Sequence, residues 1–264
     1  MGNNIHDVDL NKLLPHVIAA AKEAGRAILE VYSSNFSVEE KQDNSPLTLA
    51  DKLSHRIIAK RLSEIEGGLI PILSEEGKEI PYETRKSWEY IWLVDPLDGT
   101  KEFIKRNGEF TINIALIRGQ RPVLGVVYIP VTETLYAAYD GAGAYKEIKG
   151  RKIELPEQQM SGRLTIVGSR SHATEELAAF VEEMKRKYGE VDFISAGSSL
   201  KFCLVAEGKA DVYPRLGPTM EWDTAAGQAI AEQAGASVVE MKTEKPLLYN
   251  KQNLLNPLFM VSRR

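Results

Sequence analysis

Acidic side chains follow three apolar runs of this sequence, at points where a strand would end or a helix would begin. These acids are Glu75, Asp95 and Asp223. Rigid scaffolds often present catalytic groups at such ends. Several converging carboxylates repel one another unless a cation neutralises them. Because oxygen ligands suit magnesium, calcium or manganese better than zinc, the pattern predicts a site for a hard divalent cation.

The run Asp95-Pro96-Leu97-Asp98-Gly99-Thr100 carries two aspartates in one shaped turn. Pro96 fixes its φ angle and Gly99 permits a positive one, so both aspartates can point at one place. Each acid also has an ordinary explanation. Asp-Gly is common in simple turns, Asp223 suits a helix N-cap, and Glu75 suits a solvated loop. The combination favours a metal site.

The elements that position these acids can be read from hydrophobic spacing. Helical spacing predicts helices over 12–32 and 49–65. Apolar runs predict strands at 90–94, ending at Asp95, and at 111–117, 123–129 and 134–138. After a polar linker at 149–161, strands and helices alternate, with strands at 164–167, 191–194, 211–215 and 236–239 and helices at 174–187, 198–207 and 223–235. This order predicts an α/β (α+β layered) fold.

Length and composition fit one compact unit. The 264 residues are 43% hydrophobic and 27% charged, which allows both a large core and a solvated surface. We expect an N-terminal α+β half, 1–150, with the metal-binding loops, and a C-terminal α/β half, 151–264, that closes the site. A net charge of −4 disfavours a long nucleic-acid partner but permits a small anion.

Cysteine usage and the lack of long apolar stretches predict a cytoplasmic protein. Cys203 is the single cysteine, so no disulfide framework can form within the chain. The first ten residues lack the layout of a signal peptide, and no stretch approaches the ~20 apolar residues of a membrane span. The sequence leaves open whether the protein is a monomer or a homodimer.

Three segments resemble signatures of the inositol monophosphatase superfamily, a group of lithium-sensitive, magnesium-dependent phosphatases. Asp95-Pro96-Leu97-Asp98-Gly99-Thr100 resembles the first signature and Trp222-Asp223-Thr224-Ala225-Ala226-Gly227 the second. Ser74-Glu75-Glu76 matches the acidic pair that precedes the first. The three occur in the family's order, and the similarity covers nearly the whole chain. It implies an αβαβα sandwich with the site between the halves.

Within the superfamily the chain resembles the CysQ-type 3′(2′),5′-bisphosphate nucleotidases (EC 3.1.3.7). Inositol monophosphatases typically have Thr-Asn-Phe after Gly-Thr, where this chain has Lys101-Glu102-Phe103. The segments Asn107-Gly108-Glu109-Phe110-Thr111 and Tyr249-Asn250-Lys251-Gln252-Asn253-Leu254-Leu255-Asn256-Pro257 also support this branch. The resemblance implies hydrolysis of the 3′-phosphate of adenosine 3′,5′-bisphosphate (PAP) to AMP and phosphate, conversion of PAPS to APS, and a role in sulfur metabolism.

The resemblance also implies the metal ligands. Glu75, Asp95 and the Leu97 carbonyl would hold one Mg²⁺. Asp95, Asp98 and Asp223 would hold a second, and Glu75 with waters a third. Mn²⁺ would substitute for Mg²⁺, and Li⁺ would inhibit. Bound metal would activate the attacking water and neutralise the phosphoryl oxygens.

Catalytic and substrate-binding residues follow from the same resemblance. Thr100 and Asp51, with Glu75, would orient and deprotonate the water. Asp51 is alternatively a first-turn acid favoured by the helix dipole. Residues expected to contact substrate are Glu75, Leu97, Asp98, Gly99, Thr100, His172, Ser198, Lys201, Arg215 and Asp223. For His172, Ser198, Lys201 and Arg215, the alternative is an ordinary polar surface.

Other functions remain as alternatives. An inositol or sugar monophosphate phosphatase would keep the chemistry and change the substrate. A non-catalytic phosphate-binding regulator is disfavoured because the set of acids is complete. The resemblance allows peripheral contact with the cytoplasmic face of the inner membrane, without integral membrane association.

Overall fold

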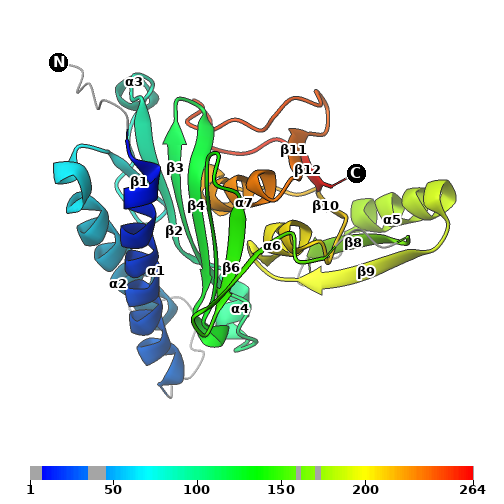
Figure 1. The fold of residues 1–264 in the computed structure, drawn as a ribbon, viewed down its shortest axis with the longest axis horizontal. Helices are drawn as coiled ribbons and strands as arrows, with labels where there is room; N and C mark the ends of the chain where they lie inside the picture. The colour runs from blue at the N-terminus through cyan, green and yellow to red at the C-terminus, as the bar shows by residue number, and fades with distance from the viewer. Residues whose placement is uncertain (1–7, 35–45, 159–161, 170–173, 264) are drawn as a thin grey trace.

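The computed structural model describes residues 8–34, 46–158, 162–169 and 174–263. Its elements are layered in the order helices, sheet, helices, sheet, helix, as Figure 1 shows. This arrangement confirms the layered αβαβα fold expected from the sequence. No helix in these ranges is both long and apolar enough to cross a membrane.

The first layer consists of α1 (Leu10–Ser33) and α2 (Pro46–Ser63), which pack against each other and cover one face of the first sheet. The apolar side of α1 is buried because its hydrophobic residues recur every three or four positions. Asp9 caps this helix by accepting a hydrogen bond from the Lys12 backbone N–H (3.2 Å). A short 3₁₀ helix, η1 (Ile65–Gly68), follows α2.

The first sheet has seven strands in chain order, with β1 and β2 parallel and the others antiparallel. The strands are β1 (Ile72–Ser74), β2 (Tyr90–Asp98), β3 (Thr111–Arg118), β4 (Arg121–Ile129), β5 (Thr134–Tyr139), β6 (Ala144–Ile148) and β7 (Arg151–Leu155). The segments between strands include α3 (Tyr82–Arg85), α4 (Thr100–Ile104) and the 3₁₀ helix η2 (Pro130–Thr132).

Two expectations about this sheet were wrong. The segment 149–161, expected to be a linker, contains β7, which pairs with β6 at the edge of the sheet. Its polar composition fits an edge strand with a solvated face. The strand expected to end at Asp95 continues to Asp98, because β3 still offers Thr111 as a pairing partner beyond a register shift. Pro96 lies within that shift, where its missing N–H is tolerated.

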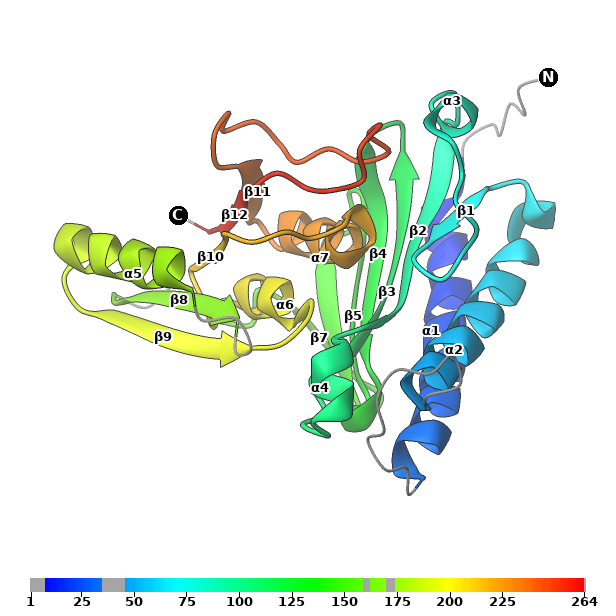
Figure 2. The same ribbon diagram turned by 180° about the vertical axis from the view of Figure 1, so that it is seen from behind.

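The second half begins with β8 (Leu164–Ser169) and forms a five-stranded sheet in the order β11-β12-β10-β8-β9. Its other strands are β9 (Val191–Ala196), β10 (Val212–Arg215), β11 (Ser237–Glu240) and β12 (Phe259–Ser262). Helices α6 (Leu200–Glu207) and α7 (Glu221–Gln233) lie between the two sheets, and α5 (Glu175–Tyr188) covers the outer face (Figure 2). The sequence did not predict β12, a strand of four residues that follows the turn signal Asn256-Pro257.

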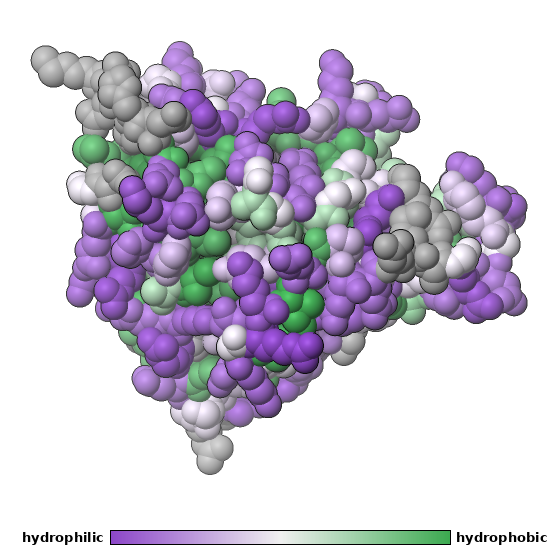
Figure 3. Space-filling view, in the orientation of Figure 1, coloured by the Kyte–Doolittle hydropathy of each residue, from purple (hydrophilic) through white to green (hydrophobic). Residues whose placement is uncertain are grey.

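Two large hydrophobic cores hold the layers together. One lies between α1, α2 and the first sheet, and the other lies between that sheet, α6, α7 and the second sheet. The face shown in Figure 3 is mainly hydrophilic, with hydrophobic areas separated by polar side chains. The hydrophobic side chains of these two cores lie between the layers. Their close packing fixes the separation across the region between the two sheets, which we call the seam.

A close approach of α7 to β4 sets the spacing across this seam. A Cβ added to Gly125 in β4 would lie 2.5 Å from the Ala226 backbone oxygen and 2.8 Å from the Ala229 Cβ. Both neighbours belong to α7. Only glycine permits this distance between the helix and the strand.

We expect Gly125→Ala to lower the free energy of unfolding by about 1–3 kcal/mol, because the added methyl group overpacks the seam. Urea denaturation measures this change. Gly162→Ala is the matched control, since its Cβ would meet nothing within 4 Å. Equal stability of Gly125→Ala and the wild type would show that α7 can move away from β4 without cost.

Candidate metal and phosphate site

Parallel pairing of β1 with β2 brings the first two acids together. Ser74 is in register with Val94, so the residues that follow them, Glu75 and Asp95, lie side by side. The Glu75 backbone N–H donates to the Val94 carbonyl (3.1 Å). Asp95 is only 1% exposed, whereas Glu75 approaches it from an exposed turn. The sequence prediction that these acids meet at strand ends is consistent with this geometry.

The irregular end of β2 turns its two aspartates toward the seam. The Leu97 backbone N–H donates to Asp95 Oδ1 (3.0 Å), which fixes that carboxylate within the bulge. Gly99 follows with φ = 98°, a left-handed conformation, and α4 starts at Thr100. Pro96 is tied to α2 through its carbonyl, which accepts from Ser54 Oγ (2.8 Å).

Asn113 and Ser199 form a polar group behind Asp98 that the sequence did not predict. Asp98 Oδ2 accepts from Asn113 Nδ2 (3.4 Å) and from Ser199 Oγ (3.2 Å). Asn113 Nδ2 also donates to Ser199 Oγ (3.0 Å), which joins the first sheet to the start of α6. Thr111 and Asn113 alternate with apolar residues on β3, and this period of two within a buried strand was the available signal.

Asp223 enters from the opposite side of the seam. It is the third residue of α7, which begins at Glu221 rather than at the expected 223. Its Oδ2 accepts from the Met220 backbone N–H (2.9 Å). Asp223 therefore caps its own helix with one carboxylate oxygen.

These acids form a compact cluster. One carboxylate oxygen from each of Glu75, Asp95 and Asp223 lies within 4.8 Å of the others. Burial, then the charges of Asp98, Glu75 and Asp223, raise the pKa of Asp95 well above its usual range. Burial and the charge of Asp98 raise the pKa of Asp223 to about 7. A divalent cation would relieve this repulsion, so the donor set fits a hard metal ion.

Asp51 of α2 lies beside this cluster. Its Oδ1 is buried and has no hydrogen-bond partner among the described residues. Burial, then the charges of Glu76 and Glu75, raise the pKa of Asp51 to about 8. The structure therefore places this side chain near the acids, as expected if it takes part in the chemistry.

A cavity of about 280 Å³ opens next to the acids, between the two halves of the chain. Its lining includes Asp98, Gly99, Thr100, Ser198, Lys201, Arg215 and Asp223. The structure thus brings together most of the residues expected to bind substrate. His172 lies outside the described residues.

Two cationic side chains of this cavity, Lys201 and Arg215, are held by backbone carbonyls. Lys201 is 4% exposed, and its Nζ donates to the Ser198 carbonyl (2.7 Å). Burial lowers the pKa of Lys201 to about 8, although the charge of Asp98 acts in the opposite direction. Arg215 donates through Nε to the Gly217 carbonyl (3.1 Å) and through Nη2 to the Pro218 carbonyl (2.7 Å). Both residues can bind an anion beside the acids.

A second cavity of about 330 Å³ adjoins the first, because Ser169, Tyr213 and Arg215 line both. Its remaining walls are largely apolar and come from α5 and the segment after β10. The site therefore combines an acidic end, a cationic middle and an apolar end.

Sequence comparison agrees with this geometry. Residues 9–259 match the model of the inositol monophosphatase family. The chain is 48% identical to the 3′(2′),5′-bisphosphate nucleotidase CysQ of Escherichia coli K12 over 253 residues, which cover 95% of this chain and 99% of that protein. It is 34% identical to the nucleotidase CysQ of Haemophilus influenzae, covering 94% of this chain and 92% of that protein.

Solved structures give the same result. CysQ from Bacteroides thetaiotaomicron superposes with a TM-score of 0.91 at 48% identity, covering 98% of this chain and 100% of that one. Mycobacterium tuberculosis SuhB superposes with a TM-score of 0.71 at 26% identity, covering 97% and 92%. Three observations support the same assignment: the matching fold, the acidic cluster in the seam and the family match over nearly the whole chain. The chain belongs to the inositol monophosphatase family.

Proposed function

We propose that this enzyme is a metal-dependent 3′(2′),5′-bisphosphate nucleotidase that hydrolyses PAP to AMP and phosphate and accepts PAPS. The observation that carries the proposal is that the cluster of Glu75, Asp95 and Asp223 lies next to a cavity lined by Lys201 and Arg215. The similarity to CysQ nucleotidases supports the same substrate. We place the enzyme in the cytoplasm and in sulfur metabolism.

The metal in this proposal is Mg²⁺, with Mn²⁺ as a substitute and Li⁺ as an inhibitor. Glu75, Asp95 and the Leu97 carbonyl would hold one ion, and Asp95, Asp98 and Asp223 would hold a second. The support is that carboxylate oxygens of Glu75, Asp95 and Asp223 lie within 4.8 Å of one another, and that the charges of the neighbouring acids raise the pKa of Asp95. Bound there, Mg²⁺ would make a water more acidic and neutralise phosphoryl oxygens.

Side chains of the protein would orient the attacking water and accept its proton. Asp51, together with Thr100, would have both roles; the support is that Asp51 Oδ1 is buried without a hydrogen-bond partner among the described residues. Glu75 would help to orient that water. Gly99 and Ser198 line the cavity where the reacting phosphate would lie.

Recognition of a nucleotide follows from the two adjoining cavities. Lys201 and Arg215 would bind the 5′-phosphate that is not hydrolysed. The apolar walls of the second cavity would accept the base. An inositol phosphate has no aromatic or hydrophobic group to bind in the apolar second cavity, so this geometry favours the nucleotide.

We expect rapid phosphate release from PAP with Mg²⁺, slow release from inositol 1-phosphate and fructose 1,6-bisphosphate, and none with EDTA. Asp95→Asn is the control for the metal site and should reduce turnover by about 10³-fold or more, since it removes a shared ligand. A preference for inositol 1-phosphate would contradict the nucleotide assignment. Normal turnover by Asp95→Asn would contradict the metal assignment.

We expect the metal-free protein to lose stability as the pH rises. Asp223 and Asp51 have folded-state pKa values of about 7 and about 8, above the unfolded value of about 3.9. Their stabilising contribution is therefore complete below about pH 4 and is lost as the pH rises through about 7 and 8. In EDTA, the melting temperature should fall by about 5 °C or more between pH 5 and pH 9. Excess Mg²⁺ should reduce this fall.

The control for this pH dependence is Asp223→Asn, whose amide cannot ionise. Its melting temperature in EDTA should depend less steeply on pH than that of the wild type. Equal slopes for the two proteins would show that Asp223 titrates normally and that the repulsion in the cluster is weak.

We expect Arg215→Ala to raise KM for PAP about tenfold, since a charge-assisted contact with a phosphate contributes about 1.5–3 kcal/mol. KM for 3′-AMP, which lacks the 5′-phosphate, should change less than about twofold. Steady-state kinetics on both substrates measures the difference. Arg186→Ala, at an exposed position of α5, is the control. Equal effects on both substrates would remove Arg215 from recognition of the 5′-phosphate.

A further inference from the structure

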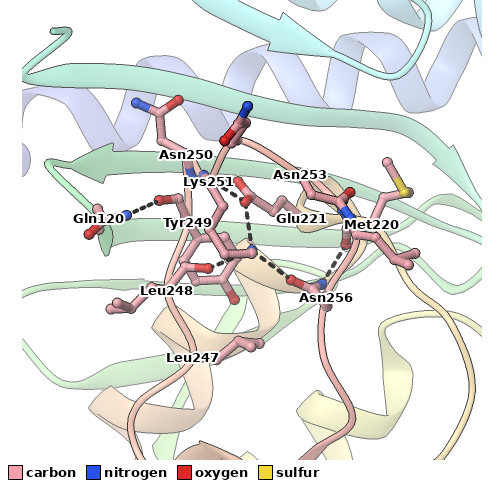
Figure 4. A network of polar contacts seen from close by, with 12 residues as sticks. Gln120, Met220, Glu221, Leu247, Leu248, Tyr249, Asn250, Lys251, Asn253 and Asn256 are labelled. Atoms are coloured by element: carbon pink, nitrogen blue, oxygen red, sulfur yellow. Dashed lines mark hydrogen bonds and ion pairs between the residues drawn. The ribbon is translucent and has the colours of Figure 1, made fainter. Parts of the chain in front are cut away.

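The segment Tyr249–Pro257 has no part in the chemistry described above, yet it contacts the helix that carries Asp223. It runs beside the first turn of α7, and Figure 4 shows Lys251 turned toward Glu221 and Asn256 turned toward Met220. Backbone bonds join the two: the Glu221 N–H donates to the Leu254 carbonyl (3.0 Å). The segment thus packs against the first turn of α7, which presents the Asp223 carboxylate.

Glu221 lies at the centre of these contacts. It is fully buried and accepts from the Asn250 backbone N–H (2.5 Å), the Lys251 backbone N–H (3.0 Å) and Lys251 Nζ (2.6 Å). A buried carboxylate with this many donors is held in one orientation. Because Glu221 and Asp223 share one helical turn, holding the first also restrains the second.

Lys251 and Asn256 extend the contacts to both sides of Asp223. Lys251 Nζ also donates to the Leu248 carbonyl (2.8 Å) and to Asn256 Oδ1 (3.3 Å). Asn256 Nδ2 donates to the Met220 carbonyl (2.8 Å) and to Thr224 Oγ1 (3.0 Å). Met220 and Thr224 bracket the turn, and the Met220 N–H is the group that binds Asp223 Oδ2 (2.9 Å).

We propose that Lys251, Glu221 and Asn256 are positioning residues, which hold the first turn of α7 so that Asp223 meets the acids of β1 and β2. This role rests on the metal site of the proposed function. Asp223 comes from a different half of the chain than Glu75 and Asp95, so the metal affinity depends on how firmly its turn is held. Removing a residue that orients a metal ligand without touching the metal commonly weakens metal affinity by about 10–100-fold.

The test is Mn²⁺ binding to the full chain, measured from the electron paramagnetic resonance signal of the free ion. Lys251→Met keeps the length of the side chain and removes the ammonium group. We expect it to weaken Mn²⁺ binding about tenfold and to lower kcat, with KM for PAP at saturating metal changed less than about twofold. If this variant does not fold, Lys251→Gln, which retains one donor, replaces it.

The matched control is Lys22→Met. Lys22 Nζ in α1 forms an ion pair with Glu147 in β6. Its N–O distance of 2.6 Å equals that of the Lys251–Glu221 pair. The Lys22→Met substitution should leave the Mn²⁺ affinity unchanged. Wild-type affinity in a folded Lys251→Met protein of lower melting temperature would overturn the proposal, because the contacts would then act on stability alone. Equal weakening by Lys22→Met would also overturn it.

The two proposals can fail separately. If the wild type binds Mn²⁺ but hydrolyses no bisphosphate nucleotide, the proposed substrate is wrong while the binding comparison still decides the role of Lys251. If the wild type binds no Mn²⁺, both the metal site and the positioning role are overturned.

Discussion

Repulsion among the carboxylates that converge on the buried Asp95 is the constraint on which the rest of this structure depends. Asp95 is almost completely buried and faces acids from the turn after β1, from its own strand and from α7. Burial in a medium of low polarity strengthens every charge interaction, so such a group is stable only with protons or a cation. The same arrangement that makes the cluster unfavourable on its own fits the oxygen donors that a small divalent ion requires.

The scaffold holds the repelling groups together by packing and by hydrogen bonds that lie outside the cluster. Gly125 allows α7 to lie directly against β4, which brings Asp223 across the seam. Asn113 and Ser199 join the two halves behind Asp98. Hydrophobic cores on both sides of the first sheet contribute the stability that keeps these repelling groups together.

The division of the site between the two halves explains how a shared phosphatase chemistry can serve a particular substrate. The acids of β1 and β2 belong to the first sheet, whereas Lys201, Arg215 and the apolar cavity belong to the second half. Changes in the second half can alter the bound molecule while the carboxylates stay in place. Asp223 is the exception, because it joins the carboxylate cluster from the second half and is held by that half's own contacts.

The sequence by itself determined the main helices, the central strands and the identity of the clustered acids. Those features are encoded locally: apolar spacing defines α1 and β3, and the Pro96–Gly99 turn shapes the end of β2. The joining of Asn113 to Ser199, the pairing of β12 and the enclosure of α7 by the Tyr249–Pro257 segment were decided by the tertiary structure alone. Each depends on residues distant in the chain that meet only after the sheets pack, and no local periodicity records such a contact.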